Sequence, residues 1–349
     1  MRTANSEQRT ANSEQRTANS EQQPSALKIL LVTQKPYNLP PLDDGIFFPI
    51  QTGKAIHDTD LGIQGDNELN GQPCDNISSK NDYYAEFTAE YWAWKNLKKL
   101  YPDVKYIGMC HYRRYFSLHE DKAFCESIPK PESFIQTFRY NPQEIIDILE
   151  SGKMIVTKPL LFSCSVQFQY CASHISDYYR VLKKVIKDNY PDYYDTFEDV
   201  MEFGTKLSAR CIFIMKWEDF EEWCEFIFPI LSILEEKIPW QNHIGTSQAR
   251  VLAVLAERLF YVWQIKNKKK RKFCAIYMPD EAIYSKRGRE GLLTFLYRLC
   301  VYMQKSLAMG ILFIPWRIKM FLRRKKAALK SDALLIFRQG VLFLQLDGL

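Results

Sequence analysis

The sequence predicts an α/β fold in which a mainly parallel central sheet is flanked by helices. Residues 27–33, 105–109 and 154–157 form short apolar runs with the length expected of buried strands. Between and after these runs, apolar residues recur at three- and four-residue spacing, as they do in amphipathic helices. Strands that alternate with helices along a chain are typical of layered α/β domains.

The first half of the chain supports this fold element by element. After the strand at 27–33, a loop rich in Pro, Asp and Gly continues to about residue 81. A helix is predicted over 83–100, because Phe87, Tyr91, Trp94 and Leu97 share one helical face. The remaining predicted elements of this half are a strand at 105–109, a helix at 143–150 and a strand at 154–157.

The second half is predicted to be mostly helical. A strand at 211–215 is expected to stand between helices, and the predicted helices cover residues 174–189, 217–237 and 247–261. In parallel sheets, ligands bind beyond the carboxyl ends of the strands. Polar residues follow Val32, Met109 and Val156 at three such ends, so a binding site is expected where these ends meet.

The two termini differ from the predicted domain. Residues 2–22 are three copies of RTANSEQ, which have no apolar period, so residues 1–25 are predicted to be a disordered tail. The catalytic domain is predicted over 26–284, followed by an amphipathic helical tail over 285–349. Residues 265–330 hold 18 Lys/Arg and 3 Asp/Glu, a net charge of +15, whereas the whole chain carries +6.

Such a basic tail is typical of a protein that binds a polyanion. The longest charge-free stretch, residues 306–316, has 11 residues, whereas a spanning helix needs about 20. We therefore expect an interfacial helix on an anionic membrane surface. Nucleic acid is a disfavoured partner, since no recognised nucleic-acid-binding module surrounds the basic clusters.

Cysteine usage and the N-terminus predict the compartment. Nine cysteines occur without a CxxC pair or a zinc-ligand spacing, which is typical of a reduced, cytosolic protein. No basic-then-apolar signal segment begins the sequence. The predicted location is the cytoplasm, peripherally on the inner face of the cell membrane.

Two polar clusters carry the functional prediction. The segment from Asp75 to Asn81 leads into a helix, so its side chains either cap that helix or hold a ribose or diphosphate at its N-terminus. The segment from His111 to Tyr115 places two arginines at the end of a buried strand, where they need anionic partners. One arginine is expected to pair with Glu86 or Glu90, and the other to hold phosphate.

These clusters resemble one known family. The segments that carry the resemblance are Asp75-Asn76-Ile77-Ser78-x-Lys80-Asn81-x-x-Tyr84-x-Glu86-x-Thr88-x-x-Tyr91-Trp92-Ala93-Trp94-Lys95-Asn96 and Ile107-Gly108-Met109-Cys110-His111-Tyr112-Arg113-Arg114-Tyr115-Phe116. They are similar to bacterial capsular and exopolysaccharide glycosyltransferases, a family formerly known only as a domain of unknown function. Weaker similarity extends the resemblance to about residues 26–270.

The resemblance implies a GT-A-like fold and an activity. The enzyme would transfer a hexose, galactofuranose being one option, from a UDP-sugar to a lipid-linked capsular or exopolysaccharide acceptor. The residues expected to bind the nucleotide-sugar are Asp75, Asn76, Ser78, Lys80, Asn81, His111, Arg113, Arg114, Lys158, Arg250 and Arg258. An inverting transferase also needs a base for the acceptor hydroxyl, and the candidates are His174, Asp177, Glu202 and Glu257.

No metal ligand is assigned. The strand end at His111 offers no carboxylate, whereas Mg²⁺ and Mn²⁺ prefer oxygen ligands, so arginine is expected to stabilise the departing diphosphate. The aspartates at 43–44 and at 58 and 60 stay as the alternative metal ligands. Thr33-Gln34-Lys35 and Arg210-Cys211-Ile212 depart from the family pattern. An inactive nucleotide-sugar-binding partner and a membrane adaptor in a polysaccharide synthesis complex are therefore the alternatives.

Overall fold

The computed structural model describes residues 26–35, 45–118, 125–128, 141–162, 164–208, 212–246 and 248–279. The predictions made for the repeats in residues 1–25 and for the basic tail in residues 285–349 lie outside the described residues. No helix within the described segments is both long enough and apolar enough to cross a membrane.

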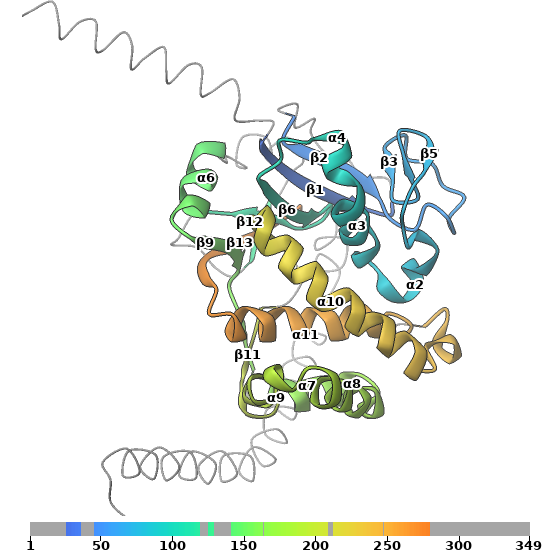
Figure 1. The fold of residues 1–349 in the computed structure, drawn as a ribbon, viewed down its shortest axis with the longest axis vertical. Helices are drawn as coiled ribbons and strands as arrows, with labels where there is room; N and C mark the ends of the chain where they lie inside the picture. The colour runs from blue at the N-terminus through green and yellow to red at the C-terminus, as the bar shows by residue number, and fades with distance from the viewer. Residues whose placement is uncertain are drawn as a thin grey trace, which may run out of the picture.

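A mixed, mostly parallel sheet forms the centre of the molecule (Figure 1). Its seven main strands lie in the order β3-β2-β1-β6-β12-β9-β13, and β7 and β8 extend it beyond β13. Only β12 runs antiparallel to its neighbours among the seven. The bounds are β1 Leu27–Thr33, β2 Phe47–Gln51, β3 Gln64–Gly65, β6 Tyr106–His111, β7 Tyr115–Ser117, β8 Cys125–Ile128, β9 Lys153–Thr157, β12 Phe213–Lys216 and β13 Lys270–Pro279. The predicted mainly parallel sheet is confirmed.

Five strands of this sheet were not expected from the sequence, namely β2, β3, β7, β8 and β13. β2 lies inside the segment that was predicted to be loop, and it pairs with β1 although it contains Pro49. β13 begins inside the basic segment and pairs in parallel with β9. Two short hairpins complete the strands, β4 (Glu68–Leu69) with β5 (Gln72–Pro73), and β10 (Leu160–Leu161) with β11 (Lys206–Leu207).

Alternating side chains of the strands fill two separate cores. On one face of the sheet, Ile29 and Ile155 pack with Ile145 and Leu149 of helix α6 (Pro142–Glu150). The opposite face is larger and is covered by the remaining helices. Gly108 lets β6 lie close to its neighbours, because a Cβ there would come within 3.0 Å of the Ile214 side chain.

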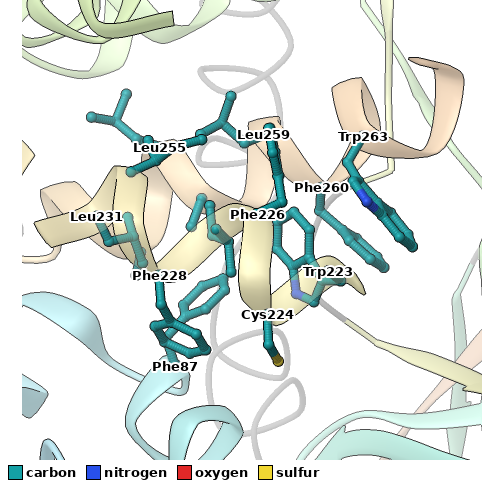
Figure 2. Packing of buried hydrophobic residues seen from close by; sticks show 14 of the residues in the cluster. Phe87, Trp223, Cys224, Phe226, Phe228, Leu231, Leu255, Leu259, Phe260 and Trp263 are labelled. Atoms are coloured by element: carbon teal, nitrogen blue, oxygen red, sulfur yellow. The ribbon is translucent and has the colours of Figure 1, made fainter. Parts of the chain in front are cut away.

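The larger face is built in two helical layers (Figure 1). Helices α10 (Trp217–Lys237) and α11 (Val251–Lys266) lie next to the sheet, and the outer layer holds α7 (Val166–Ser173), α8 (Ser176–Asn189) and α9 (Pro191–Glu198). Figure 2 shows how aromatic rings join α10 to α11: the Trp223 ring lies 4.9 Å from Phe260 and 5.6 Å from Trp263, centroid to centroid. These aromatic side chains therefore belong to the core.

The helix predicted over residues 83–100 is interrupted. It consists of α2 (Asn81–Tyr84), α3 (Phe87–Trp92), a π-helical turn (Ala93–Leu97) and α4 (Lys98–Leu100). The break falls at Ala85, whose φ of 48° and ψ of −128° are rarely adopted by a residue with a side chain. Glu86 follows directly, so the break determines where its carboxylate points.

Candidate functional site

A cavity of about 290 Å³ opens at the carboxyl ends of β1 and β6. Its lining comes from five places in the fold: the end of β1, the end of β2, the α2–α3 break, the turn after β6 and the first turns of α11. The lining residues are Val32, Thr33, Gln34, Lys35, Thr52, Ala85, Glu86, His111, Tyr112, Arg113, Arg114, Arg250, Ala253, Val254 and Glu257. A site at this edge of the sheet was expected from the sequence.

A tight turn brings both adjacent arginines to the cavity. The Arg114 N–H donates to the His111 carbonyl at 2.8 Å, and the Tyr112 N–H donates to the Val32 carbonyl at 3.1 Å. Neighbouring residues in a continuing strand would point to opposite faces, but β6 ends at His111. Arg113 and Arg114 therefore both line the cavity.

Helix α11 supplies one wall through a single face. Arg250, the N-cap residue of α11, and Ala253, Val254 and Glu257 are spaced at three, four and seven residues, so they share that face. Glu257 is half-buried there. The cavity thus has the two carboxyl groups of Glu86 and Glu257 and four cationic side chains, those of Lys35, Arg113, Arg114 and Arg250.

Glu86 is the carboxylate at the α2–α3 break. Burial raises its pKa, and the nearby charges of Arg250 and Arg114 act in the opposite direction. The sequence had assigned Glu86 or Glu90 as a structural partner of an arginine, and the structure places Glu86 near Arg114. It also places Glu86 in the cavity, which the sequence did not predict.

Glu90 lies one turn further along and does not line the cavity. Burial raises its pKa to about 8, although a hydrogen bond from the Trp223 indole N–H favours the ionised form. Its other carboxyl oxygen has no hydrogen-bond partner within the described part of the chain. Glu90 is therefore mostly protonated at neutral pH.

The segment from Asp75 to Asn81 mainly stabilises its own loop. The Asn76 side chain donates to the carbonyls of Cys74 (2.8 Å) and Asn67 (3.2 Å) and accepts from the Ser78 N–H (3.0 Å). The Ser78 hydroxyl donates to the buried carboxylate of Asp66. Asn76 and Ser78 are therefore bonded within the protein and lie outside the cavity lining.

Asp75 and Lys80 also lie outside the cavity lining. The Tyr91 hydroxyl donates to the Asp75 carboxylate at 3.1 Å, and Lys80 forms an ion pair with Glu235 at 2.8 Å. Asn81, which is also outside the lining, connects the loop to the site. Its side chain accepts from the Gln34 amide and donates to the Ala85 carbonyl at 2.7 Å.

His174 and Arg258 lie together away from the cavity lining. His174 is the C-cap residue of α7, not the first residue of a helix, and its Nδ1 lies 3.3 Å from the Gln248 side-chain oxygen. Burial lowers its pKa, and the charge of Arg258 acts in the same direction. Arg258 is buried and donates to Gln169 at 2.7 Å, so it joins α11 to α7.

The other predicted residues are also outside the cavity lining. Asp177 is exposed and pairs with Arg180 on the same helix. Glu202 is buried and accepts from Tyr179 and Lys183. Lys158 has an exposed side chain, and its backbone N–H donates to the Cys274 carbonyl at 3.1 Å.

Within the described segments, no three His, Cys, Asp or Glu side chains gather as a metal site would require. Asp60 is exposed and pairs with Lys54 at 3.0 Å, and the aspartates at 43 and 44 lie outside the described residues. In the cavity, the groups suited to an anionic ligand are the arginines, which can hold phosphate oxygens through paired N–H donors.

A family model described as domain of unknown function DUF4422 matches residues 28–269. The chain belongs to this family. The matched range contains every residue that lines the cavity. A search of curated proteins found no match.

Among solved structures, the DUF4422 domain is similar to the apo structure of WbbM, a bifunctional glycosyltransferase. The TM-score is 0.64 at 25% sequence identity, over 73% of this chain and 46% of WbbM. The chain therefore corresponds to about half of that protein's length. The similarity places the fold among glycosyltransferase-like α/β folds and leaves donor and acceptor open.

The predicted site residues did not include four polar lining residues: Gln34, Lys35, Thr52 and Glu86. Thr52 and Gln34 follow strand ends, which is the signal that could have identified them. Glu86 had no such signal, because it was placed inside a continuous helix. Five predicted residues do line the cavity, namely His111, Arg113, Arg114, Arg250 and Glu257.

Proposed function

We propose that the protein is a GT-A-like glycosyltransferase that binds a UDP-sugar in the cavity at the ends of β1 and β6. The observation that carries this proposal is the gathering of three arginines, one lysine and two glutamates at this edge of the sheet. The similarity to WbbM and the position of the cavity in an α/β fold support it.

The arginines are suited to the leaving group. A nucleoside diphosphate leaves with negative charge that must be stabilised as the sugar bond breaks. Arg113, Arg114 and Arg250 come from two separate elements, so they can approach a diphosphate from two directions. We infer that they supply the positive charge that a divalent cation supplies in other transferases.

Glu257 is the proposed base. Of the sequence candidates His174, Asp177, Glu202 and Glu257, it is the one that lines the cavity. It is half-buried on the same face of α11 as Arg250, so a sugar between them would contact both. A carboxylate there can accept the proton of an acceptor hydroxyl as the new glycosidic bond forms.

The finer features of the substrate follow from the family resemblance alone. The donor is proposed to be a UDP-hexose, with UDP-galactofuranose as one option. The acceptor is proposed to be a lipid-linked capsular or exopolysaccharide chain, reached from the cytoplasmic face of an anionic membrane. An inactive binding partner and a membrane adaptor are the alternatives that activity must exclude.

A turnover assay tests the proposed function. Purified protein is incubated with UDP-, GDP- and dTDP-sugars, and release of the nucleoside diphosphate, with water taking the place of the acceptor hydroxyl, is measured with and without EDTA. We expect release from a UDP-sugar that survives EDTA. We expect Glu257→Gln to lower it by a factor of about 10²–10⁴, the usual contribution of a general base. The exposed Glu236→Gln is the matched control.

Release from none of the donors would contradict the enzymatic proposal. Full activity in Glu257→Gln would contradict the assignment of the base. Complete loss with EDTA and rescue by Mn²⁺ would contradict arginine as the source of positive charge and would point to a metal.

A further inference from the structure

Glu86 places a carboxyl group inside a cavity that otherwise suits an anion. Arg114 and Arg250 line the same cavity and lie close enough for their charges to favour the ionised form of Glu86. A carboxylate in that position repels a phosphate group and competes with it for the nearby guanidinium groups. Its presence therefore needs a reason that phosphate binding alone does not give.

The backbone around Glu86 is built to present it. Ala85 has a φ of 48°, a left-handed backbone conformation that is strained for a residue other than glycine. The bend is held by the buried Asn81 side chain, which donates to the Ala85 carbonyl at 2.7 Å and to the Thr88 hydroxyl at 2.9 Å. Without the bend, α2 and α3 would form one continuous helix.

Glu90 shows a carboxyl of the same helix in different surroundings. It lies one turn beyond Glu86 on α3 and is bonded to the Trp223 indole, and it faces the core instead of the cavity. The two carboxyls share a helix and differ in their surroundings. Of the two carboxyls, it is Glu86 that lies among the cavity arginines.

We propose that Glu86 is a placeholder for the diphosphate: in the empty cavity its carboxylate holds Arg114 and Arg250, and the phosphates of the nucleotide take its place. This inference rests on the proposed function, because it assumes that the cavity binds a nucleoside diphosphate. The arginines are then never left in the cavity without a nearby anion. Nucleotide binding exchanges one anionic partner for another.

An unusual consequence distinguishes this role from an ordinary structural one. Removing the charge of Glu86 removes a competitor, so nucleotide binding becomes tighter. Removing a residue that merely positions the arginines would instead weaken binding. The direction of the change in affinity therefore decides between the two roles.

The experiment measures binding of UDP and of pyrophosphate by isothermal titration calorimetry at pH 7, using the full chain. The variants are Glu86→Gln, Glu90→Gln and Glu257→Gln. We expect Glu86→Gln to bind both ligands roughly tenfold more tightly, because a close opposing charge is lost. Glu90→Gln is the matched control on the same helix and should bind UDP as the wild type does.

Glu257→Gln separates a local effect from a general one. It removes the other cavity carboxylate, and a gain as large as that of Glu86→Gln would show that only net charge matters, which would overturn the placeholder. Unchanged or weaker UDP binding in Glu86→Gln would also overturn it, as would a gain for UDP without one for pyrophosphate. Absence of UDP binding in every variant, wild type included, would instead contradict the proposed function.

Discussion

At the scale of single residues, the two carboxyls of α3 show how surroundings decide chemistry. Glu86 and Glu90 are the same residue type, one helical turn apart. Glu86 lines a cavity with arginines, whereas Glu90 is buried against Trp223. Their pKa values are both raised by burial, but nearby guanidinium charge opposes that shift at Glu86 alone.

Glu90 leads to a prediction about stability and pH. Its pKa is about 8 in the folded protein and about 4.5 when exposed, so the folded state keeps a proton that the unfolded state releases between these values. The stability that the folded protein gains from keeping Glu90 protonated is complete below pH 4.5 and is lost as the pH rises through 8. Each rise of one pH unit in that window lowers the free energy of unfolding by about 1.4 kcal/mol.

The substitution Glu90→Gln keeps the size and shape of the side chain and removes its titratable carboxyl group. Melting temperatures are measured at pH 5, 7 and 9. Relative to the wild type, the melting temperature of the variant should increase as the pH rises, by several degrees at pH 9. Glu236→Gln, at an exposed position of α10, should show no such trend. A difference in melting temperature that is the same at all three pH values would refute the buried, protonated state of Glu90.

At the scale of elements, the sequence was informative where one physical signal dominated. The run at 27–33 forms β1 because all seven of its residues are buried. The sequence did not predict β2 because it contains Pro49, and it did not predict β13 because residues 270–272 are all charged. The break between α2 and α3 could not be predicted, because side-chain bonds from Asn81 to the Ala85 carbonyl and the Thr88 hydroxyl maintain it and Ala85 carries no turn signal.

The break predicts an effect of glycine that is opposite to the usual one. Glycine adopts the backbone conformation of Ala85 without strain, so Ala85→Gly should raise the free energy of unfolding by about 1 kcal/mol. In the matched control Ala89→Gly, within α3, glycine should lower it by about 1 kcal/mol. Urea denaturation measures both. Destabilisation by Ala85→Gly comparable to that of the control would show that the bend is not strained.

At the scale of the whole molecule, the fold collects residues that are far apart in the sequence. Parallel pairing of β1 with β2 and β6 aligns their carboxyl ends. One wall is α11, whose Arg250 and Glu257 follow more than 130 residues after the arginines in the turn that follows β6. The sequence predicted five of the fifteen lining residues, including Arg250 and Glu257 of α11, but it did not predict that the α2–α3 break brings Glu86 to the same site.

The central claim is that this cavity binds the diphosphate of a nucleotide. The most direct test is calorimetric titration of UDP into the wild type and into the cavity variants Arg113→Ala, Arg114→Ala and Arg250→Ala. The control is Arg180→Ala, since Arg180 is exposed on α8 and lies outside the cavity lining. The account predicts that the wild type binds UDP and that Arg180→Ala matches it. Arg250→Ala, and at least one of Arg113→Ala and Arg114→Ala, should bind about tenfold more weakly or worse, because each loses a charged hydrogen bond. Equal UDP affinity in the wild type and all three folded cavity variants would contradict the claim.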